Sequence, residues 1–111
     1  MMYKQRDIVL IPFPYSDLSS FKQRPALIIS NNNLNNTQDV ICCLVTRNSG
    51  PNCLLIPANG FAEGKLPFKS WVKPYRVFTV HKSIIKKKIC TLNFNFYDKF
   101  LNELQKYISR D

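Results

Sequence analysis

The stretch Asp7-Ile-Val-Leu-Ile-Pro-Phe-Pro-Tyr-Ser-Asp17, followed by Arg24-Pro-Ala-Leu-Ile-Ile-Ser30, decides the fold of this chain. Two short apolar runs flank a polar segment, and the second run begins directly after an arginine–proline pair. Proline restricts the residue before it to extended geometry, so Arg24 is predicted to enter a buried strand stretched out, at the junction of loop and strand. A cation fixed at such a junction can hold an anionic ligand. The alternative is a surface arginine that happens to precede a strand.

The apolar runs and the turn residues between them predict a series of short β-strands. Runs rich in β-branched and aromatic residues, bounded by Gly, Pro, Asn or Ser, are typical of strands. The predicted strands cover residues 7–13, 25–30, 39–46, 53–56, 71–80 and 89–92. Proline cannot donate to a strand ladder. We therefore expect the first strand to end near Pro12 and Pro14, and Pro74 to lie at a sheet edge or a bulge.

The segments between these strands are predicted to be connections. Residues 15–23 form a polar loop, residues 31–36 an asparagine-dense turn, and residues 57–70 a long loop or an edge element that contains two glycines and a proline.

The C-terminal segment is predicted to be an amphipathic helix. Its apolar residues recur at helical spacing and are expected to pack on the core, and they are Tyr97, Phe100, Leu101, Leu104 and Ile108. Asn93 or Asn95 is expected to cap the helix. About five to seven short strands with one C-terminal helix predict a mainly β fold, a small and strongly bent antiparallel sheet or barrel.

Length and charge limit the classes of function. A chain of 111 residues is expected to form one domain, residues 1–111. Lys and Arg outnumber Asp and Glu by 16 to 7, which gives a net charge of +9 and favours polyanionic partners such as nucleic acid, an acidic protein tail or an anionic membrane surface. A solvated basic surface is the alternative. The polar N-terminus and the lack of a run of about 18 apolar residues predict neither a signal peptide nor a membrane span, and hence a cytoplasmic protein.

The cysteines do not predict a metal site. Cys42, Cys43, Cys53 and Cys90 contain no CxxC motif, and His81 is the only histidine. We therefore expect no zinc site and no cofactor, and we expect the cysteines to be buried free thiols.

Taken in order, several stretches of this chain resemble the PemK/MazF family of toxin–antitoxin endoribonucleases. The matching stretches are DIVLIPFPYSDL, RPALIIS, CLVT, WVKPYRVFTVHKSII and KKKICTLNFNF with the helix that follows. Each stretch is short and apolar, but the ordered set runs from about Asp7 to the final helix. The specificity of the resemblance therefore comes from the whole set.

The resemblance implies a fold and an activity. The fold is an SH3-like barrel of the MazF/PemK/CcdB toxin type with a C-terminal helix, usually as a homodimer. The activity is sequence-selective cleavage of single-stranded RNA without metal, in which a 2′-hydroxyl attacks the adjacent phosphate and leaves a 2′,3′-cyclic phosphate and a 5′-hydroxyl. It also implies growth inhibition, an acidic antitoxin whose tail blocks the RNA groove, and DNA binding together with that antitoxin.

Two residues match the catalytic positions of the family. Arg24 matches the catalytic arginine and is assigned phosphate clamping and charge stabilisation, because arginine carries five fixed donors and a permanent charge. Thr46 matches a catalytic threonine or serine, and its hydroxyl can donate to the scissile phosphate. The alternative for Thr46 is a β-branched residue that merely ends a strand.

Five further residues are implied to bind RNA, and they are Tyr15, Lys22, Arg47, Lys73 and Tyr75. Tyr15 could stack on unpaired bases or pack against a dimer partner. Some relatives carry an acid, proposed as the general base, at the position of Tyr75. This departure leaves the base unassigned and leaves Tyr75 to stack on a base, to donate to phosphate or to remain an edge-strand aromatic residue.

Three other positions can be compared with the family pattern. Asp7 is expected to be structural, and Arg6 stands where many relatives have glycine. His81 stands where many relatives have aspartate; a solvated loop histidine is the preferred interpretation over an acid or base.

The departures at Tyr75 and His81 keep other classes of function open. One alternative is a non-catalytic nucleic-acid binder or a gyrase inhibitor on the same barrel. Another is a basic SH3-like module that binds peptides.

Overall fold

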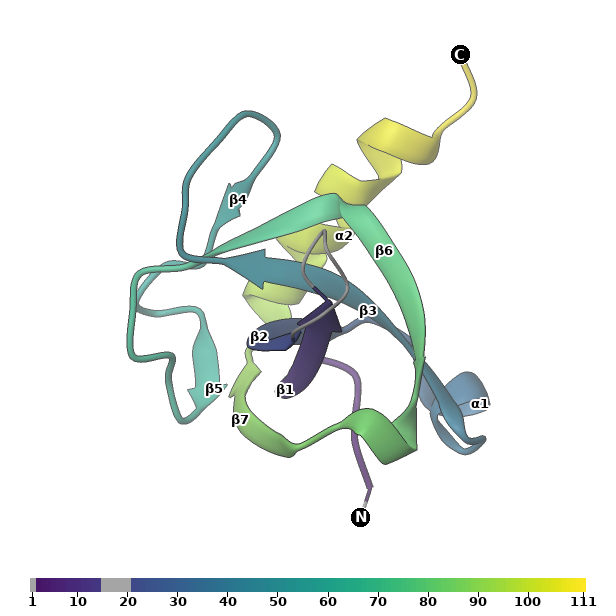
Figure 1. Ribbon diagram of the computed structural model, residues 1–111. Helices are drawn as coiled ribbons and strands as arrows, with labels where there is room; N and C mark the ends of the chain where they lie inside the picture. Colours follow the sequence, from purple (N-terminus) through teal and green to yellow (C-terminus); the bar gives the residue numbers. More distant parts are fainter. Residues whose placement is uncertain (1, 15–20) are drawn as a thin grey trace.

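The computed structural model describes residues 2–14 and 21–111 and contains one antiparallel sheet of seven strands (Figure 1). The sheet curls into an SH3-like half-barrel with the strand order β4-β6-β3-β2-β1-β7-β5. The strands are β1 (Asp7–Pro14), β2 (Phe21–Ile28), β3 (Asp39–Thr46), β4 (Leu54–Leu55), β5 (Phe61–Glu63), β6 (Trp71–His81) and β7 (Lys87–Leu92). The helices are α1 (Asn32–Asn35), the 3-10 turn η1 (Lys82–Ile84) and α2 (Phe94–Ile108). The mainly β prediction is thereby confirmed.

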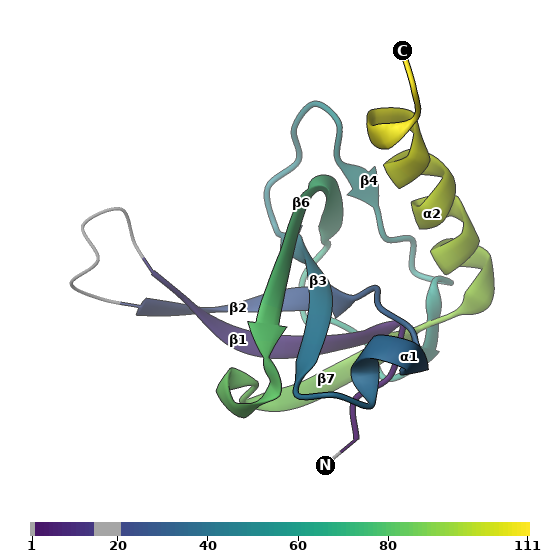
Figure 2. The ribbon, with the colours of Figure 1, turned by 90° about the vertical axis from the view of Figure 1, so that its right-hand side faces the viewer.

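The second strand begins earlier than its apolar run. β1 and β2 stay paired as far as Pro14 and Phe21, so β2 includes the polar residues before Pro25. The prediction that Arg24 stands at a loop–strand junction is therefore wrong, because Arg24 pairs with Ile11 inside the β1–β2 ribbon. The sequence marks only the apolar, buried part of β2. Pairing with β1 extends the strand through the polar residues before it. Figure 2 shows β1 and β2 running side by side away from α2.

Two other connections contain regular structure. The predicted turn at residues 31–36 forms the short helix α1, because the side chain of Asn31 accepts a hydrogen bond from the N–H of Asn33 and caps it. The predicted loop at residues 57–70 contains β5, which pairs with β7 at the edge of the sheet. This confirms the expected edge element.

The sheet is buried on both faces, and this explains why the second apolar run shows no alternation. Leu27 and Cys43 face one core cluster, which also contains residues of α2. Ala26 and Ile28 face the other cluster, together with Val9.

The C-terminal helix covers the first of these clusters with its N-terminal half. Asn93 is the N-cap, as predicted, and its side chain accepts a hydrogen bond from the N–H of Phe96. Phe100 is fully buried, and burial of such a side chain contributes about 1.5–3 kcal/mol. The expectation that Leu101 and Ile108 pack on the core is wrong, because these side chains are 42% and 71% exposed. The buried face of α2 instead includes Phe96. No helix in the described part of the chain is long and apolar enough to cross a membrane.

Asp7 joins the start of β1 to β7 and to the N-terminal turn. Its buried carboxylate accepts hydrogen bonds from the backbone N–H of Lys4 (2.9 Å) and from the hydroxyl of Thr91 (2.8 Å), and it lies 3.7 Å from the ammonium of Lys88. Buried carboxylates need such partners because desolvation of an unpaired charge is costly. The structural role expected for Asp7 agrees with these contacts.

Replacing Asp7 by alanine should therefore destabilise the fold. The Asp7→Ala variant loses both hydrogen bonds and the ionic contact with Lys88, so we expect the free energy of unfolding to fall by about 2–4 kcal/mol. Urea denaturation followed by circular dichroism measures this change. Asp39→Ala, at an exposed carboxylate, is the matched control and should stay within about 0.5 kcal/mol of the unmodified chain. Equal midpoints for the two variants would contradict the anchoring role.

The cysteines should react very differently with a thiol reagent. Burial raises the pKa of Cys42, Cys43 and Cys90 to about 12, so these thiols stay protonated and covered, whereas Cys53 is half-buried. At about pH 8 we expect one fast-reacting thiol in the folded chain, because the thiolate is the reactive form. Titration with Ellman's reagent should count all four cysteines after denaturation. The Cys53→Ser variant should lose the fast phase, and a fast reaction of several thiols in the folded chain would contradict the assignment.

Candidate active site

The candidate site forms where β2 and β3 separate. These strands pair at Ala26 with Leu44, Leu27 with Cys43 and Ile28 with Cys42, and their pairing ends there. Continuing the same register by two residues on each strand sets Arg24 opposite Thr46. Residues two apart on a strand lie on the same face, so both polar side chains share the face of Ala26 and Leu44.

Two adjoining cavities open at this separation. The first, which we call the cationic cavity, has a volume of about 320 Å³ and is lined by Phe13, Lys22, Arg24, Leu44, Thr46, Asn48, Lys73 and Arg76. The second, which we call the inner cavity, has a volume of about 290 Å³ and is lined by Leu10, Lys22, Gln23, Arg24, Pro25, Val45, Thr46, Arg47, Leu66, Pro67, Phe68, Ser70 and Ile89. Lys22, Arg24 and Thr46 line both. The structure therefore brings together the two residues predicted to be catalytic.

Thr46 is held in place by the turn that follows β3. Its side chain is 7% exposed, and its hydroxyl oxygen accepts a hydrogen bond from the backbone N–H of Asn48 (3.1 Å). A hydroxyl that accepts through one lone pair keeps its proton for donation to another group. Thr46 can therefore donate into either cavity.

The charge of the site has one sign. Among the described residues that line the two cavities, every charged side chain is Lys or Arg, and none is Asp, Glu, His or Cys. Dense positive charge at a concave surface favours anionic ligands, and arginine suits phosphate because its donors form a planar fork. The described residues also contain no group of three or more His, Cys, Asp and Glu side chains that could hold a metal ion.

A bulge in β6 brings two of these cations to the cationic cavity. The pairing of β3 with β6 shifts between Cys43↔Val77 and Val45↔Val72, which confirms a bulge at Pro74. Residues 73–76 of β6 stand against Leu44 alone, so β6 has three extra residues there, and such an insertion redirects the side chains around it. Lys73 lines the cationic cavity, as does Arg76.

The structure separates the predicted RNA-binding residues into groups. Lys22 lines both cavities, Lys73 the cationic cavity and Arg47 the inner cavity. Tyr75 lines neither, because its ring packs edge-on against Tyr107 of α2 with the ring centroids 6.3 Å apart. Tyr15 lies outside the described residues.

His81 has a local structural role. It ends β6 and caps η1, and its Nδ1 accepts a hydrogen bond from the N–H of Ser83 (3.1 Å). It is exposed and lines neither cavity, as expected of a solvated histidine, but it belongs to β6, where it pairs with Asp39, and not to a loop.

Three residues of the site are not predicted by the sequence. Arg76 follows Pro74 and Tyr75, and only the bulge places it beside Lys73. Asn48 lies between two predicted strands and Phe68 in a predicted loop, so neither has a periodic signal. The charge of Arg76 was the only available indication.

A family model described as "PemK-like, MazF-like toxin of type II toxin-antitoxin system" matches residues 4–108. Three solved structures with the same fold illustrate the similarity, although identities this low establish the fold alone. A MazE–MazF structure from Deinococcus radiodurans has a TM-score of 0.80 at 16% identity and covers 100% of this chain and 99% of that chain. An endoribonuclease in complex with its cognate antitoxin from a mycobacterial species has a TM-score of 0.77 at 17% identity, with coverages of 98% and 95%. The Mycobacterium tuberculosis toxin MazF-mt6 has a TM-score of 0.74 at 16% identity, with coverages of 96% and 99%. No curated protein sequence matches this chain.

Proposed function

The chain belongs to the PemK-like, MazF-like toxins of type II toxin–antitoxin systems, and from this premise we propose that it is a metal-independent endoribonuclease that cleaves single-stranded RNA. The observation that carries the proposal is that Arg24 and Thr46 line the same two cavities among further cations. The similar mycobacterial protein is itself described as an endoribonuclease. Selective cleavage of messenger RNA would make this chain a toxin that inhibits growth.

The proposed reaction needs no group outside the RNA as nucleophile. The 2′-oxygen of one nucleotide forms a bond to the adjacent phosphorus, and the bond from phosphorus to the 5′-oxygen breaks. The products are a 2′,3′-cyclic phosphate and a 5′-hydroxyl. The 2′-hydroxyl loses its proton to water, and the departing 5′-oxygen takes a proton from water.

Arg24 and Thr46 stabilise the charge that develops in this step. The guanidinium of Arg24 holds two of the phosphorane oxygens, and the hydroxyl of Thr46 donates to one of them. Donors fixed in advance around a developing oxyanion are usually the largest single contribution to catalysis. Lys22, Lys73 and Arg76 bind the flanking phosphates in this scheme.

The partners proposed for this toxin are an acidic antitoxin and a second copy of the chain. The structures from Deinococcus radiodurans and from the mycobacterial species contain an antitoxin, and the +9 charge of this chain suits an acidic one. A homodimer would cover apolar side chains that the described structure leaves exposed. These are Val77 and Tyr75 on β6 (both 46% exposed) and Tyr107 and Ile108 on α2 (40% and 71%).

Removing either catalytic side chain should abolish most of the cleavage. We expect Arg24→Ala to lower the rate by at least about 10³-fold and Thr46→Val by about 10²- to 10³-fold, because each removes a donor to the phosphorane. Cleavage is measured on labelled RNA in excess chelator, and the ends are then identified chemically. Arg110→Ala and Thr79→Val, both at exposed positions, are matched controls that should retain full activity.

Each other outcome of this experiment counts against a definite part of the proposal. Products with 5′-phosphate ends would exclude attack by the 2′-hydroxyl. Full activity of Arg24→Ala would remove Arg24 from the mechanism. RNA binding without any scission would favour the non-catalytic binder.

RNA affinity should depend steeply on salt. If Lys22, Arg24, Lys73 and Arg76 neutralise about four phosphates, the logarithm of affinity should fall with the logarithm of salt concentration with a slope of about −3 on single strands. Lys73→Ala should make this slope shallower by about 0.7. Fluorescence anisotropy with a non-cleavable 2′-O-methyl oligonucleotide measures it, with Lys99→Ala on α2 as the control. A flat dependence would contradict a phosphate-binding cavity.

A further inference from the structure

A short irregular segment separates the inner cavity from a third cavity. Residues 66–70 line both, apart from Lys69, which lines only the third. This third cavity, which we call the outer pocket, has a volume of about 380 Å³ and is lined by Leu55, Ile56, Pro57, Ala58, Phe61, Lys65, Leu66, Pro67, Phe68, Lys69 and Ser70. Residues 66–70 therefore lie between the cavity that contains Arg24 and the mostly apolar outer pocket.

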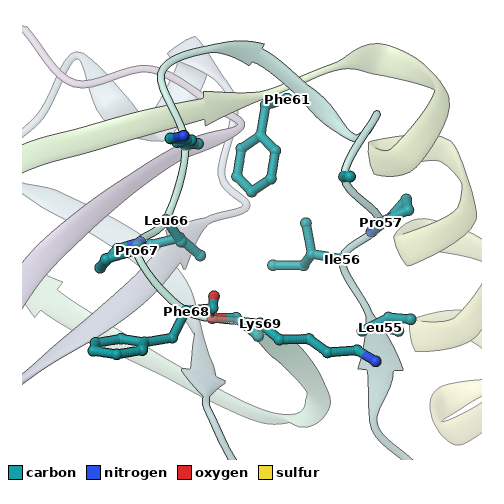
Figure 3. Close-up of a pocket in the computed structure, with 11 residues that line it drawn as sticks. Leu55, Ile56, Pro57, Phe61, Leu66, Pro67, Phe68 and Lys69 are labelled. Carbon is teal, nitrogen blue, oxygen red and sulfur yellow. Dashed lines mark hydrogen bonds between the residues drawn. The ribbon is translucent and has the colours of Figure 1, made fainter.

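Phe68 is the exposed aromatic residue of this segment. Its side chain is 56% exposed, and the guanidinium carbon of Arg47 lies 4.4 Å from the centre of its ring. Figure 3 shows the ring pointing away from Phe61 and Ile56, whose side chains both point into the outer pocket. The ring of Phe68 therefore lies on the surface against Arg47, and it does not fill the outer pocket.

We propose that the ring of Phe68 is the stacking surface for a nucleobase next to the cleaved phosphate, and that Arg47 holds the phosphate of that nucleotide. This inference rests on the proposed endoribonuclease activity. Because Phe68 lines the same cavity as Arg24 and Thr46, a strand whose phosphate contacts Arg24 places a neighbouring base within reach of the ring. Aromatic rings beside cations are the common means of binding unpaired bases.

The direction of the Phe68 ring, in surroundings whose charged residues are all basic, favours RNA over a protein partner as the occupant. Each base of RNA carries a phosphate, and every charged residue lining the inner cavity or the outer pocket, within the described ranges, is Lys or Arg. An apolar side chain from a protein would be expected to enter the outer pocket between Phe61 and Ile56. The ring of Phe68 points away from that space.

A double-mutant cycle between the protein and the RNA tests the proposal. The cut site of the unmodified chain is first mapped on a long RNA. An oligonucleotide with that site and a 2′-deoxy sugar at the cut is then prepared intact and with a single abasic nucleotide at each position in turn. We expect Phe68→Ala to weaken binding of the intact oligonucleotide by about 5- to 150-fold, as for loss of one stacked base.

The coupling between the two changes identifies the base. At one position next to the cut, the abasic nucleotide should weaken binding to the unmodified chain by a similar factor and should cause no further loss with Phe68→Ala. Phe68→Trp should restore binding, because it keeps an aromatic face. Phe94→Ala is the matched control, since Phe94 is 68% exposed, carries Arg6 at 3.8 Å from its ring centre and lines neither the cavities nor the outer pocket.

The outcomes separate this inference from the proposed function. If the unmodified chain cuts no RNA in the mapping step, both fail. If it cuts RNA but the losses from Phe68→Ala and from every abasic position simply multiply, only the stacking surface is overturned. The same holds if Phe68→Ala binds RNA normally and weakens only the complex with an acidic antitoxin. Circular dichroism and the melting temperature establish that each variant is folded.

Discussion

The pairing of β2 with β3 ends at Ala26 and Leu44, and the candidate site depends on that ending. If the ladder continued, the strands would close over the space now bordered by Arg24 and Thr46. Instead β2 stays with β1 as far as Phe21, and β3 ends at Thr46. Two polar side chains therefore stand at the rim of a sheet whose interior is apolar on both faces. The two apolar clusters hold β2 and β3 in place, and these strands determine where the side chains of Arg24 and Thr46 lie.

Among the described residues, the acidic side chains that form ion pairs lie outside the site, and no cation of the site takes part in these pairs. The ion pairs in the described ranges join Lys88 to Asp7 and Glu63, and Lys106 to Glu103, none of which lines the cavities. Like charges held close together repel and lower the stability of the fold. The fold sustains the cluster because its free energy comes from the two apolar clusters. An anionic ligand would relieve the repulsion, so the same arrangement that costs stability favours binding.

The sequence predicts those parts of the structure that burial determines. β3 has the predicted bounds, because its apolar residues face both clusters, and the N-cap at Asn93 follows from side-chain chemistry. The sequence does not predict the start of β2, because pairing with β1 extends this strand through polar residues that the apolar pattern does not include. The register that sets Arg24 opposite Thr46 depends on contacts distant in sequence. Proline predicts a bulge or an edge at position 74, and the structure has a bulge there. Which side chains the bulge redirects depends on the three-dimensional path of β6, which the sequence does not show.

The position of Tyr75 bears on which groups catalyse the proposed reaction. Its ring packs on Tyr107, so this position, where the family resemblance implies an acid in some members, lines neither cavity. A positioned general base contributes about 10²- to 10⁴-fold to a rate, whereas fixed donors around the developing charge usually contribute more. In the proposed reaction Arg24 and Thr46 therefore retain the greater part of the rate enhancement. The transferred proton then exchanges with water in an open cationic cavity, where the positive charge also favours ionisation of the attacking 2′-hydroxyl.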